Sequence, residues 1–191
     1  EVARATRIFG NPGAIHKEGS DAAASLAKSR ERIALELACK AREIVFVSGG
    51  TEANNLAILG FARKLEMIGT ELSGTHWVTS SIEHPSVLEC FSDIERRGGT
   101  VTHVDPDSRG IVLAETVAGM LRPETVFVSI QWANHEIGTI QPIRDIKEIL
   151  RAFEEKHSTH STGTTSSPQA SRGLGRQIIF HTDMSQAPLY L

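Results

Sequence analysis

The sequence has few of the features that mark several classes of protein. It has two cysteines in 191 residues, and neither has a CxxC partner, so we expect buried thiols without a disulfide framework or zinc knuckle. No apolar run approaches the roughly 20 residues that span a bilayer, and the first ten residues lack the apolar core of a secretory signal. The formal net charge of −3 gives no electrostatic reason to expect binding to nucleic acid or to a membrane surface. These absences favour a cytoplasmic globular protein.

Short apolar runs alternate with segments of helical periodicity along most of the chain. Strands are predicted at residues 43–48, 76–80, 100–104, 125–131 and 177–182. Helices are predicted at residues 20–40, 51–64, 84–97, 113–121 and 142–157. Because such alternation implies right-handed crossovers, the predicted fold class is α/β, with three α/β/α layers around a mainly parallel sheet.

The regular pattern lapses between residues 157 and 176, where serine, threonine and glycine replace the apolar residues. This composition predicts a flexible surface insertion, because it cannot bury enough apolar area to pack. His157 and His160 lie in it, but no third ligand is near in the sequence. We therefore expect both imidazoles to be exposed to solvent, and no metal site.

Polar clusters follow the carboxyl ends of four predicted strands. They are SGGTEANN (48–55), SIEHPS (81–86), WANHEIGTIQP (132–142) and HTDMSQA (181–187). In a parallel sheet these ends lie along one edge, which is where open α/β folds bind ligands. The four clusters are therefore predicted to converge on one crevice.

The cluster with two glycines has the form of an anion site. Gly49, Gly50 and Thr51 stand between a predicted strand and a helix start, where free N–H groups, the helix dipole and a hydroxyl favour phosphate. No Lys-Ser/Thr pair follows, so the turn is not a Walker A loop. A plain helix cap is the alternative.

Two further residues suggest chemistry at the strand ends. Asp183 ends an apolar strand and needs a cationic partner if it is buried; a protonated pyridine nitrogen would serve. The alternative is an aspartate that caps a following helix. His84 could lie flat on an aromatic ring or move a proton, or it could simply begin a helix.

Together the clusters resemble the cysteine desulfurase family, within the class V aminotransferase group of fold-type I pyridoxal-phosphate (PLP) enzymes. The matching stretches are NPGAIHKEG (11–19), EIVFVSGGTEANNLAI (43–58), SIEHPSV (81–87), ANHEIGTIQPI (133–143) and FHTDMSQA (180–187). Their order and spacing agree with the family, and only the Ser/Thr-rich insertion falls outside. The resemblance implies that residues 1–191 are a partial PLP-binding large domain.

The resemblance implies a set of cofactor contacts. Gly50 and Thr51 would hold the cofactor phosphate, and His84 would stack on the pyridine ring and move protons as the catalytic residue. Asp183 would pair with the pyridine nitrogen, and Gln186 would hydrogen-bond the ring hydroxyl. These roles agree with the anion site and the buried acid argued above.

The resemblance also implies substrate contacts at Asn11, His16 and His135. The family usually has two asparagines before Glu-Ile-Gly, whereas this chain has Asn134 followed by His135. An imidazole at the second position can still donate a hydrogen bond near the ring hydroxyl and the substrate carboxylate, but its charge varies with pH. Met184 stands where the family usually has a small residue.

Family members convert L-cysteine to L-alanine and pass the sulfur to an enzyme cysteine as a persulfide, in iron–sulfur cluster assembly and other sulfur metabolism. Their Schiff-base lysine and sulfur-accepting cysteine both lie beyond the aspartate, and the printed chain ends at Leu191. No lysine present fits an aldimine: Lys17, Lys28, Lys40, Lys64, Lys147 and Lys156 all fall at predicted exposed positions. Cys39 and Cys90 fall on predicted helices. We therefore expect a fragment that is inactive by itself.

Alternatives remain open at this point. A selenocysteine lyase, or another class V lyase or aminotransferase, shares these motifs and would act on a different substrate. A non-catalytic module that keeps the cleft for binding or dimerisation is the alternative of another class. The family resemblance implies L-cysteine as substrate, sulfur-acceptor proteins as partners and a homodimer for the complete protein.

Overall fold

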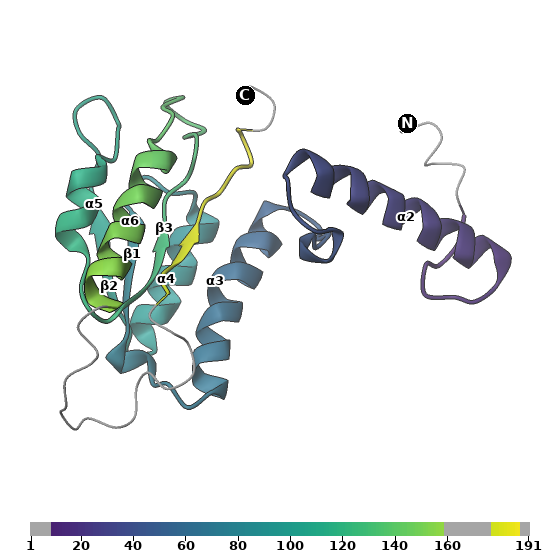
Figure 1. Cartoon of the computed structure of the whole chain (residues 1–191), viewed down its shortest axis with the longest axis horizontal. Helices are drawn as coiled ribbons and strands as arrows, with labels where there is room; N and C mark the ends of the chain where they lie inside the picture. The colour runs from purple at the N-terminus through teal and green to yellow at the C-terminus, as the bar shows by residue number, and fades with distance from the viewer. Residues whose placement is uncertain (1–8, 159–176, 188–191) are drawn as a thin grey trace. The chain divides into compact units, whose positions relative to one another are not determined.

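The computed structural model describes residues 9–158 and 177–187. The chain divides between Val47 and Ser48 into two compact units (Figure 1). The predicted insertion is almost wholly outside the described residues, except that residues 157 and 158 form the end of a helix.

The first unit contains one long helix, α2 (Lys17–Glu36). It begins three residues earlier than predicted, because His16 caps it: the His16 Nδ1 accepts a hydrogen bond from the Gly19 N–H at 3.2 Å. It also ends earlier, because Ala38 adopts a φ of 50°. The Cys39 N–H then bonds the Ala34 carbonyl at 2.9 Å, as in a Schellman motif. Cys39 therefore lies half-buried in a turn and not, as predicted, in a helix.

The predicted strand at residues 43–48 is wrong. A short 3-10 helix, η1 (Ala41–Glu43), replaces its start, because the Glu43 carboxylate accepts a hydrogen bond from the Lys40 N–H at 2.9 Å. The Ile44 carbonyl accepts from Arg30 at 3.2 Å, and the Arg30 guanidinium lies 4.9 Å from the centre of the Phe46 ring. Side chains thus take up polar groups that a sheet ladder would use, and no described strand pairs with this segment.

The second unit is built on a four-stranded sheet, all parallel, in the order β2-β1-β3-β4. The strands are β1 (His76–Ser80), β2 (Thr100–Val104), β3 (Thr125–Ser129) and β4 (Ile179–His181). All four were predicted, with β3 and β4 shorter at their ends. The parallel sheet is therefore confirmed.

Helices cover both faces of this sheet, which confirms the three layers (Figure 1). On one face α3 (Gly50–Met67) and α4 (Pro85–Arg96) pack on Trp77 and Phe127, whose rings stack with centroids 5.2 Å apart. On the other face α5 (Ala114–Met120) and α6 (Ile143–Ser158) pack on Val78 and Val128. A short 3-10 helix, η2 (Leu72–Gly74), leads into β1.

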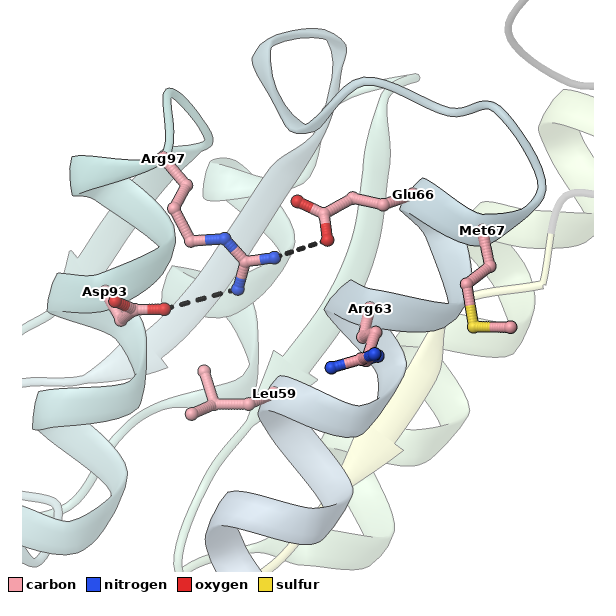
Figure 2. A pocket seen from close by; sticks show the side chains of 6 residues that line it. All are labelled: Leu59, Arg63, Glu66, Met67, Asp93 and Arg97. Atoms are coloured by element: carbon pink, nitrogen blue, oxygen red, sulfur yellow. Dashed lines mark hydrogen bonds and ion pairs between the residues drawn. The ribbon is translucent and has the colours of Figure 1, made fainter.

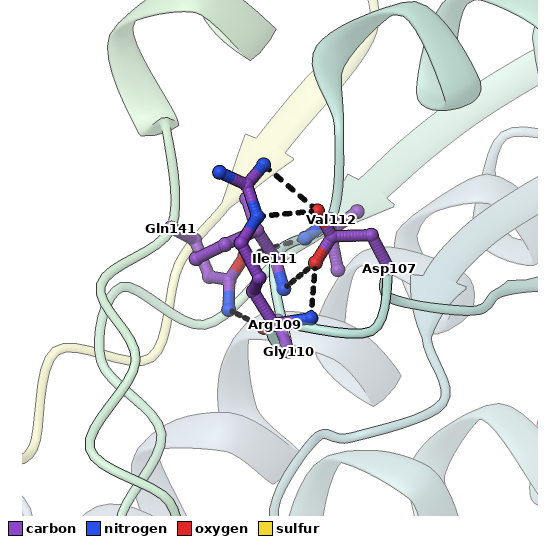
Figure 3. Close-up of polar contacts among 6 residues, drawn as sticks. All are labelled: Asp107, Arg109, Gly110, Ile111, Val112 and Gln141. Carbon is purple, nitrogen blue, oxygen red and sulfur yellow. Dashed lines mark hydrogen bonds and ion pairs between the residues drawn. The ribbon is translucent and has the colours of Figure 1, made fainter.

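Two loops beyond the strand ends are fastened to each other (Figure 3). The Gln141 side chain accepts a hydrogen bond from the Val112 N–H at 2.8 Å and donates one to the Gly110 carbonyl at 2.9 Å. Gly110 has a φ of 78°, and a Cβ there would lie 2.5 Å from the Ile137 side chain. Only glycine therefore allows this approach, which supports the loop that carries Asn134 and His135.

Candidate functional site

Asp183 lies two residues beyond the end of β4 and is half-buried. Its Oδ2 accepts a hydrogen bond from the Asn54 side chain, and its Oδ1 accepts one from the Ser185 N–H, each at 2.9 Å. Burial raises the pKa of Asp183, but the hydrogen bonds from Ser185 and Asn54 and the nearby His181 outweigh it, so the pKa lies below its usual value. Asp183 is therefore an anion at neutral pH.

His181 supports this acid from within the sheet. Its Nδ1 lies 2.8 Å from the Ser129 hydroxyl, and its ring stacks on Phe127 at 5.9 Å between centroids. Burial lowers the pKa of His181, although the charge of Asp183 acts in the opposite direction. The imidazole of His181 is therefore held in a fixed position two residues before Asp183.

Asn54, a residue that the sequence did not single out, connects two of the clusters. It lies on α3 and is only 4% exposed. Its Nδ2 donates one hydrogen bond to Asp183 and a second to the Ser86 hydroxyl, each at 2.9 Å. A buried amide that makes two such bonds holds the start of α4 against the end of β4.

His84 is the N-cap residue of α4, so the helix-start interpretation is correct for its local structure. Its Nδ1 accepts a hydrogen bond from the Ser86 N–H at 3.1 Å and lies 2.8 Å from the Ser86 hydroxyl. The exposed His84 ring also lies 5.3 Å from the His135 ring, centre to centre. The structure therefore brings together two of the predicted site residues.

Glu83, immediately before His84, is a buried carboxyl that the sequence did not single out. It is 4% exposed, and its Oε1 accepts hydrogen bonds from the Ser80 hydroxyl at 2.6 Å and the Gln131 N–H at 2.8 Å. Its Oε2 has no partner among the described residues. Burial, with a smaller contribution from Asp183, raises the pKa of Glu83 to about 7 in spite of those bonds.

The loop after β3 is hydrogen-bonded to the main chain next to Glu83. The Ile82 carbonyl accepts hydrogen bonds from the Gln131 side chain at 2.5 Å and from the Asn134 side chain at 3.0 Å. The Asn134 Oδ1 in turn accepts from the N–H groups of Glu136 and Ile137. Together with Glu83, these bonds fix the distance between the loops that carry the two histidines.

The predicted anion site lies at the start of α3. No described side chain caps this end, and the first helical bond is made by the Ala53 N–H, so the N–H groups of residues 50–52 have no intrahelical acceptor. A Cβ on Gly50 would lie 3.1 Å from the Ser185 Oγ. The free end of α3 is therefore next to the turn that holds Asp183.

The other predicted site residues are not joined to this cluster by any described contact. Gln186 lies exposed in the turn after Asp183. Asn11 and His16 belong to the first unit, where Asn11 closes a turn by accepting a hydrogen bond from the Gly13 N–H at 2.9 Å. Their roles stay predictions.

The lysines, Cys90 and His157 lie at positions that do not point to a catalytic role. All six lysines are exposed, as predicted. Cys90 is buried in α4, and burial raises the pKa of its thiol to about 11. His157 is not exposed as predicted, because its ring packs on Phe153 at 4.1 Å between centroids, and His160 lies outside the described residues. No group of three possible metal ligands occurs among the described residues.

A groove of about 610 Å³ lies away from this cluster, between α3 and α4 (Figure 2). Arg97 crosses it, with contacts of 2.6 Å to Glu66 and 3.2 Å to Asp93. None of its lining residues belongs to the strand-end clusters. The groove is therefore separate from the predicted cofactor site.

Similarity to known proteins places the chain in a family. The family model described as aminotransferase class V matches residues 3–160. The chain belongs to this family. Its members are PLP-dependent enzymes. Among the described residues, no helix is both long and apolar enough to cross a membrane.

One of two curated relatives of this class V chain is named as a cysteine desulfurase. "Cysteine desulfurase IscS" of Dictyoglomus turgidum is 38% identical over 82% of the chain, and "NifS/IcsS protein homolog" of Lactobacillus delbrueckii is 44% identical over 80%. The chain spans 38% of the length of each. A solved structure titled "SspA in complex with cysteine" superposes with a TM-score of 0.77 at 35% identity, covering 97% of this chain and 47% of the other. The fold of the family is therefore shown for the chain.

Proposed function

We propose that this chain forms the cofactor-holding part of a PLP-dependent cysteine desulfurase. The observation that carries the proposal is the ionised Asp183, tied to Asn54 and held beside the free N-terminus of α3. The names of the curated relatives and the relative solved with cysteine support the choice of desulfurase within the family.

The residues present fit the cofactor. Asp183 accepts hydrogen bonds from Asn54 and Ser185, and its side chain is only half-buried, so a cationic ring nitrogen can reach it. The free N–H groups that begin α3 suit a phosphate, and Gly50 has no side chain to obstruct it. Asp183 and the start of α3 lie next to each other, because Ser185 donates to Asp183 and its hydroxyl lies close to Gly50.

When bound, PLP supplies an electron sink for the carbon next to the substrate amine. Asp183 would hold the proton on the ring nitrogen, which a carboxylate with a lowered pKa does without taking that proton itself. Gly50 and Thr51 would bind the phosphate. His84 would stack on the ring and transfer a proton there.

Further contacts would orient the substrate. His135 lies next to His84 and would donate a hydrogen bond to the ring hydroxyl or to the substrate carboxylate. Gln186 would donate to the ring hydroxyl, and Asn11 and His16 would contact the substrate. L-cysteine is the proposed substrate, and an acceptor protein is the proposed destination of its sulfur. The complete protein would be a homodimer in which residues 1–191 are part of the large domain.

The test compares Asp183→Asn with Asp145→Asn in the full-length protein, because Asp145 is exposed on α6. Loss of a charge-assisted hydrogen bond should weaken PLP binding by about 10- to 100-fold for the first variant and leave the second unchanged. Fluorescence titration measures the affinity, and release of alanine from L-cysteine, with a thiol reductant present to reduce the enzyme persulfide to sulfide, measures the activity. Wild-type affinity in Asp183→Asn would refute the proposed site, and a protein that binds PLP without releasing alanine would refute the reaction.

A further inference from the structure

A chain of hydrogen bonds runs from Asp183 to His84, and its direction can be derived. An ionised carboxylate only accepts hydrogen bonds, so the Asn54 atom that lies 2.9 Å from the Asp183 Oδ2 must be the amide nitrogen. This contact fixes the orientation of the buried amide. Asn54 is therefore a donor toward Asp183.

The next step follows from the number of hydrogens available. The Asn54 nitrogen carries two hydrogens, and the second is donated to the Ser86 Oγ at 2.9 Å. The Ser86 hydroxyl thus acts as an acceptor toward Asn54, and its own single hydrogen is left to be donated elsewhere. The nearest partner is the His84 Nδ1, at 2.8 Å.

The main chain gives the same direction independently. The Ser86 N–H, which can only donate, lies 3.1 Å from the His84 Nδ1. Both donors of Ser86 therefore face the same ring nitrogen, which must offer a lone pair. In a neutral imidazole the hydrogen bond made by one nitrogen decides which nitrogen carries the proton.

We propose that Asn54 and Ser86 are positioning residues that hold neutral His84 as the tautomer with its proton on Nε2. The ring then offers a hydrogen-bond donor at Nε2, while its lone pair is occupied by the start of α4. The chemical use of that donor rests on the proposed function, in which His84 would give a proton to the bound substrate or cofactor from Nε2. The tautomer itself depends only on Asp183, Asn54 and Ser86.

The first measurement is ¹⁵N NMR of the imidazoles in the full-length protein without cofactor, at a pH where the rings are neutral. Comparison with His84→Gln assigns the His84 signals. We expect Nε2 at the shift of a protonated nitrogen and Nδ1 at that of an unprotonated one. A proton on Nδ1 would overturn the proposal.

The second measurement reverses the donor. Ser86→Asp replaces the hydroxyl by a carboxylate, which accepts from both Asn54 and His84, while the main-chain N–H of residue 86 still faces Nδ1. The form with its proton on Nδ1 should therefore become populated, and the two nitrogen shifts of His84 should move toward each other. Ser86→Thr, which keeps the hydroxyl, should retain the wild-type shifts, and Ser81→Asp controls for an added charge because Ser81 is exposed in the same loop. An unchanged tautomer in Ser86→Asp would show that the Ser86 hydroxyl does not direct the ring. Neither result depends on PLP binding, so failure here and failure of the proposed function are distinguishable.

Discussion

Replacement of Glu83 by glutamine should change how the stability of the second unit depends on pH. The Glu83 carboxyl is 4% exposed and its Oε2 has no partner among the described residues, so its charged form is costly. Glutamine keeps an oxygen for the bonds from Ser80 and Gln131 but cannot ionise. The comparison therefore isolates the ionisation of one side chain.

The magnitude follows from the two pKa values. Burial raises the pKa of Glu83 from 4.5 to about 7, so the folded protein holds the proton more tightly than the unfolded chain does. Stability is then lost as the pH rises from about 4.5 to about 7, and it levels off above the folded pKa. At about 1.4 kcal/mol per pKa unit the loss is about 3 kcal/mol.

Native-state hydrogen exchange of the amides in β1 and β3 reads the opening free energy of this sheet. Measured between pH 5 and pH 8, the stability of Glu83→Gln relative to wild type should rise by about 2–3 kcal/mol, because part of the change falls below pH 5. Glu95→Gln, at an exposed position on α4, should follow the wild-type curve. Parallel curves for Glu83→Gln and wild type, or a difference that grows toward acid pH, would refute the reasoning.

Two other substitutions test the site and the scaffold. His135→Asn in the full-length protein should change the pH dependence of kcat/KM, because an amide does not titrate where an imidazole does; superimposable pH profiles would mean that the imidazole does not titrate usefully. Gly60→Ala should raise stability by about 0.5–1 kcal/mol, since a Cβ there meets nothing within 4 Å and alanine is the better helix former. Urea unfolding measures this gain, and a lower midpoint for the variant would contradict the open space seen beside α3.

Periodicity alone was sufficient to predict most of the framework. The strand of residues 76–80 and the helix that follows it were predicted because a short apolar run and a 3.6-residue repeat leave different patterns. The same rule failed at residues 43–48, where the apolar run is present but no described strand offers it a ladder. A pattern of side chains predicts which segments can be strands, and only the tertiary structure supplies the neighbour.

The residues that hold the site together left a weaker signal than those that face a ligand. Asn54 sits beside Asn55 in a helix, and nothing local shows which amide turns inward to meet Asp183, 129 residues away. Glu83 next to an exposed histidine has the appearance of an ordinary surface acid until the fold buries it against Ser80 and Gln131. Contacts between distant segments decide both cases, so the roles of Asn54 and Glu83 could not be predicted from the sequence alone.

The alternatives of helix cap and functional residue turn out to describe the same atoms. His84 caps α4 through Nδ1, and that contact is also what would leave its proton on Nε2. The first turn of α3 lacks a side-chain cap, which leaves its N–H groups to an anion. The start of α4 follows β1, so its N–H groups must be satisfied at the edge where such folds bind ligands. The way in which the N-termini of α3 and α4 are capped or left uncapped therefore belongs to the structure of the candidate site. A residue that caps a helix can also have a function there.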